Sequence, residues 1–173
     1  MGRGGRGVGR YGGGVGRRGV GIAVGGLVAV LAGCAGTVPV EVAPYAHDPA
    51  CADVVVRLLH DLDDMPRLAT DAQAALAWGE AAAPVVLRCG VEPLPPTTDT
   101  CVTAADDRAS VDWVAVPGPE DADGNAEWTF TTYGRVPAVE VSVPAAVTAV
   151  RSTSFLLELG PAIARVEATR TCL

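Results

Sequence analysis

The fold is decided by residues 126–143, which have the sequence AEWTFTTYGRVPAVEVSV. Apolar or β-branched side chains occupy every second position over 128–132 and again over 139–143, with a turn over 134–137 between the two runs. A period of two is typical of strands that turn one face towards a core. The stretch therefore predicts two neighbouring strands of an antiparallel sheet.

Two more strands precede this stretch. Residues 84–91 (PVVLRCGV) form a short apolar run, and residues 111–115 (VDWVA) carry apolar side chains at alternate positions. The turn residues Asp123-Gly124-Asn125 separate 111–115 from 128–132, and this arrangement predicts a hairpin.

The residues before these strands predict a helix. Asp48-Pro49 is a helix-start signal, because the carboxylate can cap the first turn and proline fits its first position. Apolar side chains then recur at helical spacing from Val54 to Met65, and Pro66 ends the helix.

A second helix is predicted at the C-terminal end, over residues 155–166, with a kink or an interruption at Gly160-Pro161. The Ala-rich residues 67–83 are expected to hold a helical turn before Trp78-Gly79. The order of elements predicts an α+β domain of two layers, in which the N- and C-terminal helices pack on one face of a four-stranded antiparallel sheet.

The first 33 residues have the composition of a lipoprotein signal peptide. Five arginines and no acidic residue precede an uncharged apolar run over 19–33, which is too short for a membrane-spanning helix. The run ends in Leu31-Ala32-Gly33-Cys34, which resembles the lipobox of bacterial lipoproteins. We therefore expect cleavage before Cys34 and a lipid on its thiol. The alternative is an uncleaved anchor that happens to contain a cysteine.

Lipid on Cys34 would hold the protein on the outer face of the cell membrane. Residues 34–47, which contain two prolines, are expected to form a flexible tether, and residues 48–173 to form the folded domain. The general secretory route is favoured over the twin-arginine route that Arg17-Arg18 suggests.

The part that follows the signal peptide is acidic. From Cys34 onwards the chain has 8 arginines against all 20 acidic residues, a net charge of −12. Binding to nucleic acid requires clustered basic residues that neutralise phosphates, so this balance argues against nucleic acid as a partner.

Four further cysteines, Cys51, Cys89, Cys101 and Cys172, predict two disulfides in an exported domain. Three pairings are possible, and we favour Cys89–Cys101 with Cys51–Cys172. The alternative is a zinc site, but there is no CxxC spacing and His47 and His60 lie far from three of the cysteines. No metal and no cofactor is expected.

The chain also resembles a family of small actinobacterial envelope proteins defined as domain of unknown function 3515. The resemblance covers roughly residues 48–173 and rests on an ordered set: a helix at Cys51, Ala77-Trp78-Gly79, 86–91, Val111-Asp112-Trp113, 130–135, Val139-Glu140-Val141 and a cysteine next to the C-terminus. The family implies an exported, often lipidated, disulfide-bonded domain and no known reaction.

The polar and aromatic residues within and near these motifs are the candidate binding residues. They are Arg88, Asp112, Trp113, Trp128 and Arg135. The alternative for the arginines and Asp112 is a structural ion pair, and the alternative for the tryptophans is the core.

Catalytic and metal patterns are weaker. No GxSxG motif surrounds a serine, and Asp121 to Glu127 fits a hairpin turn better than a calcium loop. We therefore expect a non-enzymatic interaction module that binds an envelope protein. One alternative is a small-ligand or cell-wall-precursor binding protein, and a second is an envelope hydrolase that uses Asp112 and Glu127.

Overall fold

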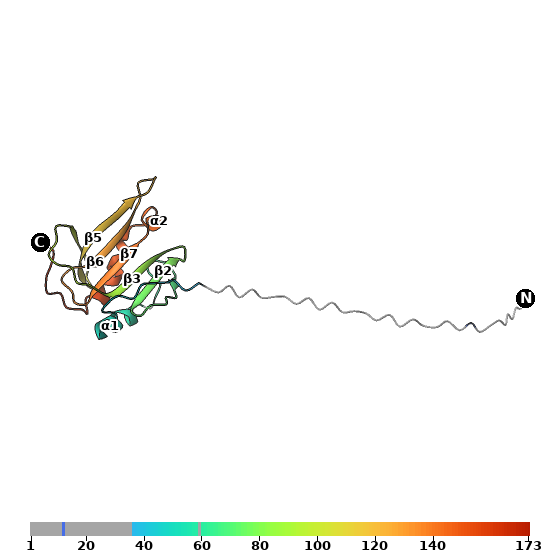
Figure 1. Cartoon of the computed structure of the whole chain (residues 1–173), viewed down its shortest axis with the longest axis horizontal. Coiled ribbons are helices and arrows are strands. Elements are labelled where there is room, and N and C mark those ends of the chain that lie inside the picture. Colours follow the sequence, from blue (N-terminus) through green and yellow to red (C-terminus); the bar gives the residue numbers. More distant parts are fainter. Residues whose placement is uncertain (1–11, 13–35, 59) are drawn as a thin grey trace, which may run out of the picture. The chain divides into compact units, whose positions relative to one another are not determined.

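The computed structural model describes residues 12, 36–58 and 60–173, and its main feature is one seven-stranded sheet (Figure 1). All strand pairs are antiparallel, and the order across the sheet is β1-β2-β3-β7-β6-β5-β4. The strands are β1 (Arg67–Leu68), β2 (Ala75–Glu80), β3 (Ala83–Val91), β4 (Thr100–Ala105), β5 (Ser110–Glu120), β6 (Ala126–Thr132) and β7 (Ala138–Val143).

The expected four-stranded α+β fold is therefore wrong. The four expected strands correspond to β3, β5, β6 and β7, but β1, β2 and β4 complete a larger sheet with few, short helices. The Ala-rich segment 67–83 was expected to hold a helical turn, yet β2 within it pairs with β1 and β3 and has its first four residues buried. Burial and pairing on both sides outweigh the helix preference of alanine.

The N-terminal helix is shorter than expected. Helix α1 (Pro49–Arg57) begins as predicted, since the Asp48 carboxylate accepts a hydrogen bond from the Ala50 amide at 2.8 Å. It ends at Arg57, well before Pro66. The later apolar residues Leu62 and Met65 lie in a tight turn, where each backbone amide donates to the carbonyl of the other.

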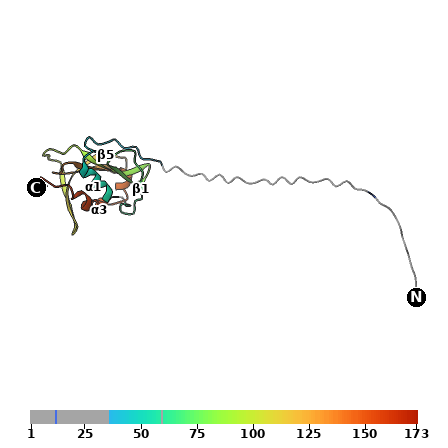
Figure 2. The same cartoon turned by 90° about the horizontal axis from the view of Figure 1, so that it is seen from below.

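Three short helical segments follow β7. They are α2 (Ala145–Thr148), the 3₁₀ turn η1 (Thr153–Phe155) and α3 (Leu156–Ile163). Helix α3 continues through Pro161, so of the expected kink or interruption at Gly160-Pro161 the interruption does not occur. Helices α1 and α3 contact each other and, together with the inward side chains of the sheet, form the main core (Figure 2). We call this side of the sheet the helical face.

Residues 38–46, expected to be a flexible tether, pack on the domain. Val38 forms a parallel bridge with Thr70, and the Tyr45 amide donates to the Gly90 carbonyl at 2.8 Å. Gly90 has a φ of +93°, and a Cβ there would lie 2.4 Å from the Tyr45 carbonyl carbon, so only glycine permits this approach. The folded part thus begins before residue 48. The predicted signal peptide and Cys34 lie outside the described residues.

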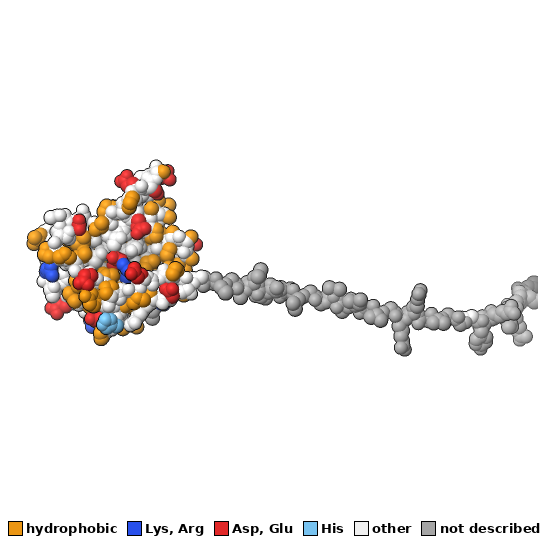
Figure 3. All heavy atoms as spheres, in the orientation of Figure 1, with side chains coloured by type: hydrophobic (Ala, Val, Ile, Leu, Met, Phe, Trp, Pro, Cys, Tyr) orange, Lys and Arg blue, Asp and Glu red, His pale blue; other side chains and the backbone are white. Residues whose placement is uncertain are grey.

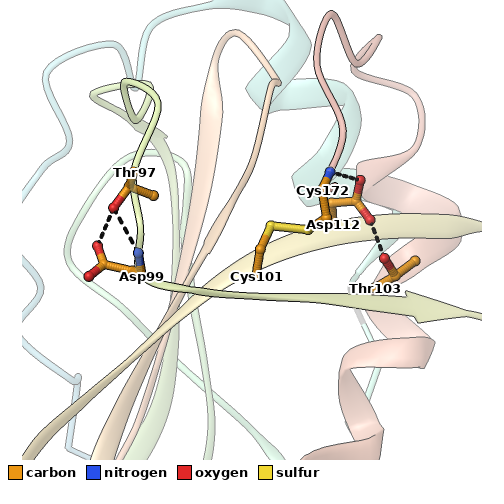
Figure 4. Close-up of a disulfide and its surroundings, with 6 residues drawn as sticks. All are labelled: Thr97, Asp99, Cys101, Thr103, Asp112 and Cys172. Carbon is orange, nitrogen blue, oxygen red and sulfur yellow. Dashed lines mark hydrogen bonds between the residues drawn. A yellow bond between two sulfur atoms is a disulfide. The ribbon is translucent and has the colours of Figure 1, made fainter.

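Both disulfides form, but the favoured pairing is wrong. One bond joins Cys51 to Cys89. The other joins Cys101 to Cys172 (Figure 4). Cys89 is on β3 and Cys101 on β4, and four strand spacings of about 4.8 Å, roughly 19 Å, separate those strands. A disulfide requires Cα atoms about 5–6 Å apart. Helix α1 instead packs over β3 and brings Cys51 to Cys89.

Candidate functional site

A groove of about 550 Å³ lies on the helical face where the sheet extends past its helices. In Figure 1 the β5–β6 hairpin extends beyond the other strands, with α2 beside it. The groove runs between this hairpin, β4 and the segment from α2 to η1. Its lining residues are Thr100, Val102, Ala115, Trp128, Phe130, Thr148, Arg151, Ser152 and Thr153. We call it the Trp128 groove.

The floor of the groove is apolar and comes from the sheet. The rings of Trp128 and Phe130 stack with centroids 6.1 Å apart and planes inclined by 19°. Phe130 is buried and Trp128 is partly exposed, so the indole covers the phenyl ring and presents itself to a ligand. Val102, at the β4 edge, is 39% exposed. Val102 and Trp128 lie at opposite ends of this floor, since Val102 pairs with Trp113 of β5 and Trp128 pairs with Pro117, four residues further along. Burial of the exposed part of either side chain would be stabilising.

The opposite wall is polar and comes from the α2–η1 segment. Thr148 Oγ1 donates to the Ala126 carbonyl at 2.8 Å and thereby holds α2 against β6. Arg151 Nη1 donates to the backbone carbonyl of Asp63 at 2.6 Å and to its carboxylate at 2.5 Å. Nη2 and Nε of Arg151 make no hydrogen bond to a described residue. Since no carboxylate lines the groove, a guanidinium with spare donors is its one charged group among the described residues.

A second hollow, of about 350 Å³, is lined by several charged side chains, and both of its arginines are already paired. Arg57 forms an ion pair with Asp53 at 3.2 Å, and Arg108 forms one with Asp106 at 2.7 Å. His60 is exposed there, and its backbone carbonyl accepts a hydrogen bond from buried Trp78 at 2.8 Å. These contacts hold parts of the fold together. The Trp128 groove is therefore the better candidate for a binding site.

The structure does not bring the five candidate residues together. Arg88 lies on the face opposite the helices, where it forms an ion pair with Glu140 at 2.6 Å and approaches Glu41 at 3.9 Å. Asp112 accepts hydrogen bonds from Thr103 Oγ1 at 2.6 Å and from the Cys172 amide at 2.9 Å (Figure 4). Both side chains therefore hold parts of the fold.

Trp113 and Arg135 are buried. Trp113 is 0% exposed, and its indole Nε1 finds no hydrogen-bond partner among the residues that the structure describes. Arg135 donates to the carbonyls of Val166 and Ser110 and so fixes the C-terminal segment, while burial lowers the pKa of its guanidinium. Of the five candidates, Trp128 alone lines the groove.

The carboxylates expected for an envelope hydrolase do not form a pair. Asp112 lies on β5, where it pairs with Thr103 of β4. Glu127 lies on β6 and packs beside Gly118, which is six residues further along β5 than Asp112. Six strand residues span about 20 Å. Glycoside hydrolysis requires two carboxyl groups about 5–9 Å apart, so this geometry does not support that chemistry.

The acidic segment 121–127 is a hairpin turn, as predicted. The Asp121 carboxylate accepts hydrogen bonds from the amides of Asp123 and Asn125, both at 2.9 Å, and these contacts lower its pKa. Gly124 has a φ of +80°, as such turns require. In the described residues, no cluster of three or more His, Cys, Asp or Glu could hold a metal ion.

Sequence reasoning missed most of the groove. Val102 lies on β4, which was not expected to be a strand, although Thr100, Val102 and Thr103 are β-branched and favour strands. Arg151 and its neighbours lie in a segment without a helical or strand period, so no pattern could place them opposite Trp128.

One protein family matches the chain. The model of the family described as "Protein of unknown function (DUF3515)" covers residues 20–172. No curated protein and no solved structure matches the chain significantly. None of the helices described here has the length and apolar character needed to cross a bilayer.

Proposed function

The chain belongs to the DUF3515 family of proteins of unknown function, and from that premise we propose that it is a non-enzymatic binding module, anchored by lipid on Cys34 to the outer face of the cell membrane. The observation that carries this proposal is the Trp128 groove. It combines a partly exposed aromatic ring, an apolar floor and a guanidinium with spare donors. Binding sites typically have this mixture of apolar surface and a few placed polar groups.

The anchoring half of the proposal rests on the sequence around Cys34. Two or more acyl chains bind a bilayer stably, since each buried CH₂ contributes about 0.8 kcal/mol. Metabolic labelling with a palmitate analogue is the direct test. The wild type should be labelled and sediment with membranes, and Cys34→Ala should lose the label and remain as an uncleaved precursor. Label on Cys34→Ala would refute the assignment of the lipid site.

The binding half is tested by crosslinking in intact cells, with affinity recovery through a tag after Leu173 and mass spectrometry. Trp128→Ala removes the exposed ring, and Val56→Ala is the matched control because Val56 is 59% exposed on α1, away from the groove. A partner recovered with the wild type and with Val56→Ala, but depleted with Trp128→Ala, would support the groove. Equal recovery from all three would place the binding surface elsewhere.

A small ligand or cell-wall precursor is the second candidate for the same groove, and the volume of about 550 Å³ favours it. If crosslinking recovers no protein, purified protein should be tested against soluble cell-wall fragments by quenching of tryptophan fluorescence. Quenching that disappears in Trp128→Ala would support the small-ligand function.

A further inference from the structure

Strand β4 leaves an unprotected edge on the sheet. Its sequence is TCVTAA, which contains no charged residue and no proline, and most of its residues are exposed. Natural sheets usually protect an edge strand with charges, prolines or very short length. The opposite edge has that protection, since β1 is only two residues long. The two edges therefore differ in their ability to accept another strand.

The free backbone groups of β4 can be assigned from its neighbour β5. The Tyr133 amide donates to the Asp112 carbonyl at 2.8 Å, so the backbone groups of Asp112 face β6. Asp112 is the partner of Thr103 in the β4–β5 register. Because an antiparallel ladder alternates between bonded and non-bonded pairs, the N–H and C=O of Thr103 point outward, as do those of Cys101 and Ala105.

The Trp128 groove opens at this same edge. Thr100 and Val102 line the groove and lie on the helical face of β4, opposite Ala115 and Trp113 of β5. A strand added beside β4 would place every second side chain on that face. One of those side chains would enter the groove beside Thr100 and Val102, at the end of the groove that these two residues line.

We infer that the edge of β4 and the Trp128 groove together bind an extended peptide segment of a partner protein, which adds an eighth strand to the sheet and places an apolar or aromatic side chain in the groove. This inference rests on the proposed binding function and names the class of its ligand. Strand addition gives affinity through main-chain hydrogen bonds, and the groove gives selectivity for one side chain.

The charges that flank β4 favour a basic segment. Asp99 precedes the strand, and Asp106 and Asp107 follow it, with Arg108 engaged by Asp106. Acidic side chains are also spread over the face of the domain shown in Figure 3. The partner segment should therefore carry Arg or Lys near its ends.

The same charges disfavour a second copy of this chain as the added strand. Antiparallel pairing of two β4 strands centred on Thr103 would bring Asp99 of one copy beside the Asp106–Asp107 turn of the other. Like charges placed opposite each other destabilise strand pairing.

The test compares two substitutions at one position. Thr103→Pro removes the outward N–H, and proline is tolerated on edge strands at such positions. Thr103→Val is the matched control: it also loses the hydroxyl that bonds Asp112, but it keeps the N–H. Both variants are accepted only if both disulfides form and the far-UV circular dichroism matches the wild type. The probe is a random dodecapeptide library displayed on phage.

We expect the wild type to select peptides without proline, with alternating apolar or β-branched residues and Arg or Lys near the ends. These peptides should bind Thr103→Val within about twofold of the wild type and Thr103→Pro at least tenfold more weakly. Selected peptides that bind Thr103→Pro as well as the wild type would overturn strand addition. Failure to select any peptide would overturn a peptide ligand.

The outcomes separate this inference from the proposed function. If no peptide is selected but crosslinking still recovers a partner that depends on Trp128, the binding function stands and strand addition fails. If neither experiment yields a partner, both fail. If the wild type forms a dimer in solution and Thr103→Pro abolishes that dimer, the added strand would be β4 of a second copy of this chain. That result would overturn the inference.

Discussion

Replacement of Cys51 by alanine tests the disulfide pairing and its energy in one variant. Cys51 is bonded to Cys89, and both are 0% exposed. Among the four disulfide-forming cysteines, the variant should therefore leave one free thiol, at Cys89, with the Cys101–Cys172 bond intact. The pairing that the sequence favoured would instead free Cys172. Differential alkylation before and after reduction, followed by peptide mass spectrometry, identifies the free residue.

The expected loss of stability in Cys51→Ala follows from the length of the loop that the disulfide closes. The Cys51–Cys89 bond spans 38 residues, and the loss of such a constraint on the unfolded chain costs about 4 kcal/mol in the chain-entropy model. For the unit Cys34–Leu173, each kcal/mol lowers Tm by roughly 3–4 °C, so a fall of roughly 12–16 °C is expected. Thermal denaturation followed by circular dichroism measures it.

The second disulfide is the internal comparison. The Cys101–Cys172 bond spans 71 residues, for which the same model gives about 4 kcal/mol as well. Cys101→Ala should therefore lower Tm by a similar amount. A free thiol at Cys172 in the Cys51→Ala variant, or a fall in Tm below about 4 °C in either variant, would refute the reasoning.

Three other changes test local features. Asp48→Ala should destabilise the domain by about 1 kcal/mol in urea unfolding, because α1 loses its cap; an unchanged midpoint would count against the cap. Gly90→Ala should make the chain near Tyr45 sensitive to chymotrypsin while the rest stays resistant, because the added Cβ has no room; continued resistance at Tyr45 would contradict this packing. The hydrogen bond from Arg108 lowers the pKa of the Asp106 carboxyl group below its ordinary 3.8. The ionised Asp106 therefore stabilises the folded state above pH 3.8, and this stabilisation is lost as the pH falls through the lower pKa of the folded state. Asp106→Asn should flatten the fall of Tm between about pH 4 and pH 2, and an unchanged slope would exclude this ion pair as a cause.

The strands that the sequence predicted are those whose side chains alternate in character. β6 and β7 show the period of two clearly, and each has one face on the core. β2 has no such period because its residues Ala75 to Trp78 are all buried, whichever face they occupy. A strand covered on both faces carries no alternation that could distinguish it from a buried helix.

The disulfide pairing depends on strand order, which local patterns do not contain. Cys89 and Cys101 are close in sequence, and that proximity favoured a bond between them. In the sheet, β7, β6 and β5 are inserted between the strands that carry them. These three strands lie there because β7 pairs with β3. That pairing is supported by core packing between segments distant in sequence, for example at Val139 and Val141.

The groove has a similar origin, in a mismatch of lengths. Helix α3 has eight residues and is about 12 Å long, whereas β5 has eleven residues and extends about 36 Å. The helix can therefore cover only part of the strand. Trp113 and Trp128 point to the same face, and Trp113 is 0% exposed whereas Trp128 is partly exposed in the groove. In the sequence the two tryptophans look equivalent, because each stands in an alternating run. Different helices lie over the two positions: α3 contacts β4 and β5, whereas the four-residue α2 contacts β6. The positions of these helices over the sheet depend on long-range packing and could not be placed from the residues alone.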